Sequence, residues 1–394
     1  MKKIIIIVIT IIILSFSIGV QASEVQETGE QILNKNGYVS TDDKEIESLY
    51  NYLDNMKNEY EVIKDMDFKS YVNNYIKSGS GNFSFYKFIV SVFSYAFRNV
   101  AYSFKDLGLL IIICILCSLL SLLERAFENS NANDMAYFAA YSLILIVLTN
   151  TFYSSASIAI DAINKIADFM AALIPVLLLL LASLGGFAEA TIMDPLIIGS
   201  INIITRIYID FVIPLIFMAF VLSFVNSLSK EYKLSNFTKL INQVALWIQG
   251  GMLTIFIGMI SIKGITAQTM DQVTAKTAKF AVDSFVPIVG KCLSDAVSTV
   301  AGYSLLLKNA VGVVGLLIII LIAIYPIVEL FILSLLFKLT ASIIEPVGDK
   351  RIVSLVNSVG DSILMLMSCL ISVSFMFFII VAIVASLGSK VISG

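Results

Sequence analysis

Seven apolar windows divide this sequence, and each is long enough to cross a membrane as a helix. They cover residues 107–123, 136–160, 169–187, 208–228, 244–262, 311–336 and 361–387. A helix rising 1.5 Å per residue needs about 20 residues to cross roughly 30 Å of hydrocarbon. The windows predict an all-α, polytopic helical membrane protein with seven or eight spans in the mature chain, since segment 278–306 is an eighth candidate.

The composition supports a membrane protein and argues against two functional classes. Hydrophobic residues make up 58% and charged residues 14%, against about 45–50% and 25% in soluble proteins. A net charge of −3 without a basic block argues against nucleic-acid binding. The absence of histidine removes the commonest general base and metal ligand. We therefore expect no enzyme activity, no catalytic residue, no cofactor and no metal site.

The first 22 residues are typical of a signal peptide. Lys2 and Lys3 precede an apolar run, and Val20-Gln21-Ala22 gives a small-residue cleavage pattern. An uncleaved first anchor is the alternative, because the apolar run is long for a signal core. Both interpretations place the following segment outside the cytoplasm.

Residues 23–104 are predicted to form a small, acidic, helical extracytoplasmic domain followed by an interfacial helix. Apolar residues recur three or four apart from Ile46 to Met56, which is helical spacing. Aromatic residues then dominate the stretch after residue 82, as expected at a membrane surface, and a short buried span is the alternative. Residues 105–168 would hold the first two transmembrane helices.

Three landmarks recur in the second half of the sequence and indicate an internal duplication. The landmarks pair Pro175 with Pro287, Pro214 with Pro326, and Asn242 with Asn357, at offsets of 112, 112 and 115 residues. We predict one membrane repeat at 169–262 and a second at 276–387. Three crossings per repeat would make the copies inverted, whereas a first element that dips in and returns would make them parallel. The four prolines are predicted helix breaks, and Gly185-Gly186 and Gly250-Gly251 are predicted close-packing sites.

The second repeat begins with a polar amphipathic segment at 276–306. Lys279, Asp283, Lys291 and Asp295 recur around Pro287 at intervals that form one stripe on a helix. Opposite charges four apart partly compensate each other. The stripe could line a water-filled path, dock another membrane subunit, or lie on the headgroups.

Glu329 is an acidic residue inside an apolar window, three residues after Pro326. A carboxylate facing lipid is costly, so such a residue usually faces protein or water. Glu329 could be a proton or ion site, or a structural partner for a lysine such as Lys291.

Two segments carry a resemblance to a known family. They are SIKGITAQTMDQVTAKTAKFAVDSFVPIVGKCLSDAVSTVAGYS and IIEPVGDKRIVSLVNSVGDS, which follow the exported acidic region in this order. This combination resembles the stage III sporulation protein AE family of endospore-forming bacteria. The resemblance implies a membrane subunit of the channel or export complex that connects mother cell and forespore and supports forespore development.

The resemblance also implies location and partners. The expected location is the mother-cell-derived outer forespore membrane, with the N-terminal domain in the intermembrane space. The expected partners are other membrane proteins of the same sporulation operon, a forespore-made channel protein and membrane lipid, and the chain could form an oligomer. The alternative function is a stand-alone ion- or proton-coupled transporter built from the two repeats, with Glu329 and the charged stripe as coupling groups.

Overall fold

The computed structural model describes residues 49, 51–54, 90, 92, 94–95, 98, 108, 111–116, 119, 131–184, 187–228, 234–259, 289–346 and 349–387. Every regular element in these ranges is a helix. The main elements are α6 (Asn131–Ser183), α7 (Phe187–Ile207), the π-helix η2 (Tyr208–Val212), α8 (Ile213–Leu228), α10 (Val289–Ile344) and α11 (Lys350–Ser386). A further helix covers Ser235–Met259.

Five helices in this part of the chain are long and apolar enough to cross a membrane. They cover Tyr141–Ser183, Pro195–Asn226, Ser235–Met259, Ser304–Ile344 and Lys350–Ser386. The predicted all-α fold with several helices apolar enough to span a membrane is therefore confirmed for the described residues. The predicted count of seven or eight spans is not, because parts of window 107–123 and of segment 278–306 lie outside the described residues.

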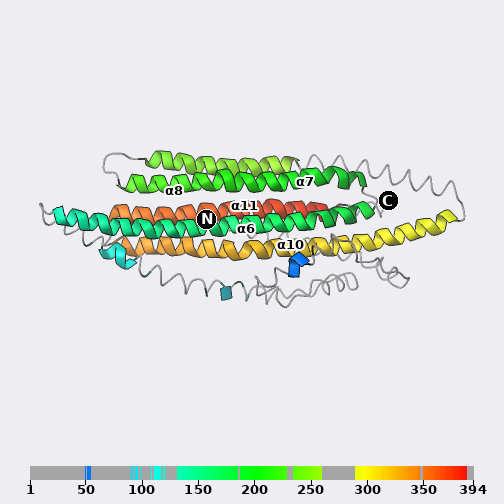
Figure 1. Ribbon diagram of the computed structural model, residues 1–394, viewed down its shortest axis with the longest axis horizontal. Coiled ribbons are helices and arrows are strands. Elements are labelled where there is room, and N and C mark those ends of the chain that lie inside the picture. Colours follow the sequence, from blue (N-terminus) through cyan, green and yellow to red (C-terminus); the bar gives the residue numbers. More distant parts are fainter. Residues whose placement is uncertain are drawn as a thin grey trace.

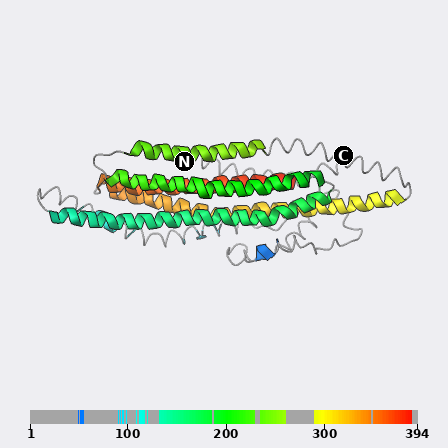
Figure 2. The ribbon, with the colours of Figure 1, turned by 45° about the horizontal axis from the view of Figure 1, so that its top comes forward.

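The long helices run side by side (Figures 1 and 2). α11 contacts α10, α6 and α8, and α7 lies against α6. Asp349 caps the start of α11 by accepting a hydrogen bond of 2.8 Å from the Arg351 N–H. The Ser235–Met259 helix lies at the outer edge of the bundle, next to α7 and α8 (Figure 1).

Aliphatic and aromatic side chains fill the space between α6, α8, α10 and α11. The rings of Phe152 and Phe220 stack at 4.0 Å between α6 and α8. A Cβ placed on Gly315 would lie 2.5 Å from a Leu173 methyl carbon and 3.4 Å from Val381. Because Gly315 has no side chain, α10 can lie close to both α6 and α11 at this point. Small residues commonly have this role between membrane helices.

The predicted spans 136–160 and 169–187 share one helix. α6 continues for 53 residues, about 80 Å at the helical rise, and it also runs through the predicted domain boundary at 168/169. The polar residues between the two windows are explained by amphipathicity: Asp161, Lys165 and Asp168 are exposed, while Ile163 and Ile166 are fully buried. The sequence suggested a loop where the structure has two helical turns with a polar outer face.

The prolines do not end the helices that contain them. α6 continues through Pro175 and α10 through Pro326, and α7 also contains Pro195. Proline lacks a backbone N–H, so one backbone hydrogen bond of the helix is missing. Packing against neighbouring helices can still keep such a helix continuous. Pro214 coincides with a local change, because η2 ends two residues before it and the Ile213 N–H bonds to the Tyr208 carbonyl. The wider π turn gives room to the proline ring. Pro287 lies outside the described residues.

The two predicted repeats fold differently at one point that can be compared. In the first copy α6 ends at Ser183 and α7 begins at Phe187, whereas the positions 112 residues later lie inside α10. The duplication therefore stays a prediction. The signal peptide and most of the N-terminal domain lie outside the described residues.

Candidate functional site

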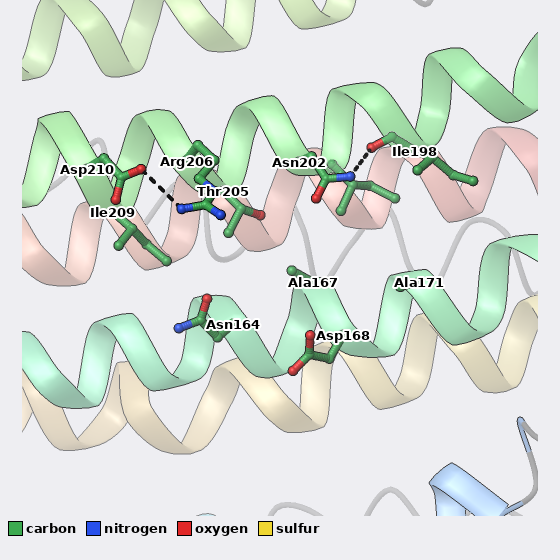
Figure 3. A pocket seen from close by; sticks show the side chains of 11 residues that line it. Asn164, Ala167, Asp168, Ala171, Ile198, Asn202, Thr205, Arg206, Ile209 and Asp210 are labelled. Atoms are coloured by element: carbon green, nitrogen blue, oxygen red, sulfur yellow. Dashed lines mark hydrogen bonds and ion pairs between the residues drawn. The ribbon is translucent and has the colours of Figure 1, made fainter.

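A polar groove lies between α6 and the continuous helix formed by α7 and η2 (Figure 3). Its volume is about 430 Å³. The residues that line it are Asn164, Ala167, Asp168, Ala171, Ile198, Ile201, Asn202, Thr205, Arg206, Ile209 and Asp210. The sequence did not single out this site.

Helical spacing explains why these side chains meet. Asn164, Ala167, Asp168 and Ala171 recur three and four apart and so share one face of α6. Asn202, Thr205, Arg206 and Ile209 follow the same rule on the facing helix. The two alanines are short, and this leaves the space between the helices open.

The groove has two carboxylates and one guanidinium. Arg206 Nη1 lies 3.7 Å from Asp210 Oδ2, one helical turn further along, and both side chains are exposed. Such an exposed pair contributes little to stability. Asn202 donates to the Ile198 carbonyl at 3.0 Å, and Thr205 Oγ1 is buried without a hydrogen-bond partner among the described residues. Polar atoms of this kind suit water or the polar groups of a partner.

Both walls of the groove belong to helices that are long and apolar enough to cross a membrane. Its α6 residues fall within Tyr141–Ser183, and the facing residues fall within Pro195–Asn226. Ionised groups open to acyl chains would be costly. Water or another polypeptide should therefore cover this groove.

Glu329 has a structural partner that the sequence did not predict. Tyr95 donates a hydrogen bond of 2.7 Å from its hydroxyl to Glu329 Oε2. The Tyr95 ring packs edge-on against Tyr325 with centroids 4.7 Å apart, and the Arg98 guanidinium lies 5.9 Å from the Tyr95 centroid. The half-buried carboxylate thus contacts a segment more than 200 positions away in the chain.

The predicted pairing of Glu329 with Lys291 is wrong. Both residues belong to α10, which is one helix from Val289 to Ile344. They lie 38 residues apart on it, or about 57 Å along the axis. The predicted spans do not include a single helix of 56 residues there.

The charged stripe is only partly described. Lys279 and Asp283 lie outside the described residues, as does Pro287. Lys291 and Asp295 occupy the first turns of α10, and their side chains are outside the described set. The stripe therefore stays a prediction.

Two buried polar features escaped the sequence reasoning. Lys308 is fully buried within the Ser304–Ile344 helix, although it falls between the predicted segment 278–306 and window 311–336. Gln249 is also buried; its Nε2 donates to Cys369 Sγ at 3.3 Å, and Ser368 Oγ donates to its Oε1 at 3.1 Å. The apolar sequence on both sides of Lys308 indicates that this lysine lies within a span. A charge inside a span usually has a specific role.

Metal ligands do not cluster in the described part of the chain. No group of three or more histidine, cysteine, aspartate or glutamate side chains could hold an ion there. Cys114 and Cys369 are both buried.

Comparison with known proteins decides the family. The family model described as stage III sporulation protein AE matches residues 66–388. This chain belongs to that family. The stage III sporulation protein AE of Bacillus subtilis (strain 168) is 33% identical over 369 residues, which cover 94% of this chain and 91% of the relative. No solved structure matches the chain.

Proposed function

We propose that this family member is a non-enzymatic membrane subunit of the channel or export complex that connects mother cell and forespore. It would support forespore development together with the other membrane proteins of its operon and a forespore-made partner. Its place would be the outer forespore membrane, with the N-terminal region in the intermembrane space. Membership of a sporulation family and five helices apolar enough to cross a membrane support this assignment.

Charges on the outside of apolar helices favour a subunit over a self-sufficient transporter. Asp168, Arg206 and Asp210 are exposed although their helices are apolar enough to cross a membrane. Lipid would not solvate these groups, whereas a neighbouring subunit could. This observation carries the proposal.

Purification with and without partners tests the proposal. A tagged copy from sporulating cells should retain the other membrane proteins of the operon. The chain alone, reconstituted into liposomes, should give no flux of ions or small solutes above that of protein-free liposomes. Sustained flux from the purified chain would contradict the subunit role.

Glu329 supports the second candidate, a proton- or ion-coupled transporter. The side chain lies in a membrane-crossing helix, as coupling carboxylates do. Glu329→Gln separates the two functions, because an amide oxygen can still accept the Tyr95 hydrogen bond but cannot carry charge. A coupling role predicts loss of heat-resistant spores. A structural role predicts near-normal sporulation.

Tyr95→Phe is the matched control for Glu329→Gln. It removes the hydrogen bond of 2.7 Å and leaves the carboxylate without this donor. A structural role predicts a loss of about 1–3 kcal/mol in stability, seen as less folded protein in membranes. If Tyr95→Phe is silent while Glu329→Gln abolishes sporulation, the transporter interpretation gains and the structural one fails.

A further inference from the structure

An ion pair lies on the outer surface between α10 and α11. Lys338 Nζ donates to Asp361 Oδ1 at 2.6 Å, and the side chains are 36% and 55% exposed. The helices are in tight contact at this point. Ser334 Oγ donates to the Gly360 carbonyl at 2.8 Å, and a Cβ on Gly360 would lie 3.1 Å from Lys338 Cγ.

Apolar side chains lie on both sides of the pair along the helix axis. Phe331, Leu335, Leu339 and Ile343 of α10 are all exposed. Their spacing of four residues makes one stripe about 18 Å long, and Lys338, three residues after Leu335, lies beside it. The ion pair thus borders an exposed apolar stripe on a helix that is apolar enough to cross a membrane.

The adjoining face of α11 carries small polar residues. Ser354, Asn357 and Asp361 are exposed and recur at helical spacing. Small hydroxyl side chains on membrane helices allow another helix to approach closely. The surface therefore combines an apolar stripe, a central ion pair and a row of small polar groups.

Lipid alone is a poor cover for this surface. Lipid tails can cover the apolar stripe but would not solvate the two ionised side chains beside it. A protein surface with complementary charges at the same depth would compensate both groups.

We propose that this face docks a second copy of the chain through a two-fold axis parallel to the helices. Copies inserted with the same orientation keep equal residues at equal depth. A two-fold rotation then places Lys338 of one copy opposite Asp361 of the second copy, and the reverse contact follows by symmetry. Four alternating charges close into a neutral cluster. A second copy supplies this complementarity without any further assumption about partners.

The proposal goes beyond the role of the chain in a larger complex and is independent of it. Loss of this contact would leave a subunit able to bind its other partners. Retention of operon proteins by the tagged chain would distinguish the two outcomes.

Cysteine crosslinking in membranes tests the contact directly. One tagged copy carries Leu339→Cys and a differently tagged copy carries Asn357→Cys, both with the four native cysteines replaced by alanine. The two copies should crosslink with a short thiol reagent. The matched control replaces the second copy by one with Tyr153→Cys, which is 72% exposed on α6. Equal crosslinking with the control, or none with Asn357→Cys, would overturn the proposal.

Charge reversal shows whether the pair acts between copies or within one. Lys338→Asp alone and Asp361→Lys alone should each lower crosslinking about tenfold or more, because like charges then meet. A mixture of the two single variants should recover it, since each mixed dimer joins two carboxylates to two ammonium groups. A third sample carries both substitutions, Lys338→Asp and Asp361→Lys, in the same chain. If crosslinking recovers in this double variant but not in the mixture, the ion pair acts within one chain and the dimer is refuted. Capture of a different protein at Asn357→Cys would refute it in favour of a heterologous contact.

Discussion

At the level of single residues, the glycines show how far sequence can predict close contacts between helices. The sequence predicts close packing at Gly250-Gly251, yet no described residue lies within 4 Å of a Cβ built on either residue. That prediction is wrong, and Gly185-Gly186 lies outside the described residues. The close contacts occur instead at Gly312, Gly315 and Gly360. A glycine marks a surface without a side chain, but only the neighbouring helix decides whether that surface is covered.

Gly312→Leu should destabilise the fold strongly. A Cβ at this position would lie 2.6 Å from Ala385 Cβ, and a short alanine cannot move aside. We expect a loss of about 1–3 kcal/mol, measured as a lower apparent Tm in detergent. Gly250→Leu is the matched control, since it extends into open space. Equal Tm values for the two variants would disprove the α10 to α11 contact at Gly312.

At the level of elements, α6 shows how an amphipathic turn can imitate a loop. Its charged residues between 161 and 168 are exposed, while Ala162, Ile163 and Ile166 between them are buried. A hydropathy window averages the polar and the apolar face of the helix. The mean hydropathy therefore falls at these residues although the helix continues. The π-helix before Pro214 and the unbroken α10 escaped the sequence for a related reason, because neighbouring helices decide whether a proline ends a helix.

A topology experiment follows from the continuity of α6. If one straight helix crosses once, tags inserted before Asn131 and after Ser183 should lie on opposite sides of the membrane. Two separate crossings would place both tags on the same side. Labelling of single cysteines in these tags with a membrane-impermeant maleimide measures the difference. Labelling of both tags from one side would show that α6 does not cross as a single helix.

At the level of the whole molecule, the helices differ in how much of their surface the bundle covers. The windows of α10 and α11 are mostly buried, whereas the Ser235–Met259 helix is the least buried of the five. The two C-terminal helices therefore act as the core. The Ser235–Met259 helix is left to face lipid or other proteins.

Trp247 reports on this arrangement, because it is the one tryptophan in the sequence. It is 65% exposed on the outermost helix. In liposomes of brominated phosphatidylcholine its fluorescence should be strongly quenched, since bromine quenches on contact and lipid should reach the ring. Aqueous iodide should quench it weakly. The reverse order would place this face of the helix in water and refute the lipid-facing assignment.

The sequence by itself determined the helical membrane class and the sporulation family, because apolar length and the polar segments are local properties of the chain. It also identified Glu329 as a residue to explain. The tertiary structure alone decided that Tyr95 is the partner of Glu329, that α6 is one helix, and that Asp168 and Arg206 share a groove. These features depend on which helix faces meet, and that choice is made by packing between segments far apart in the chain.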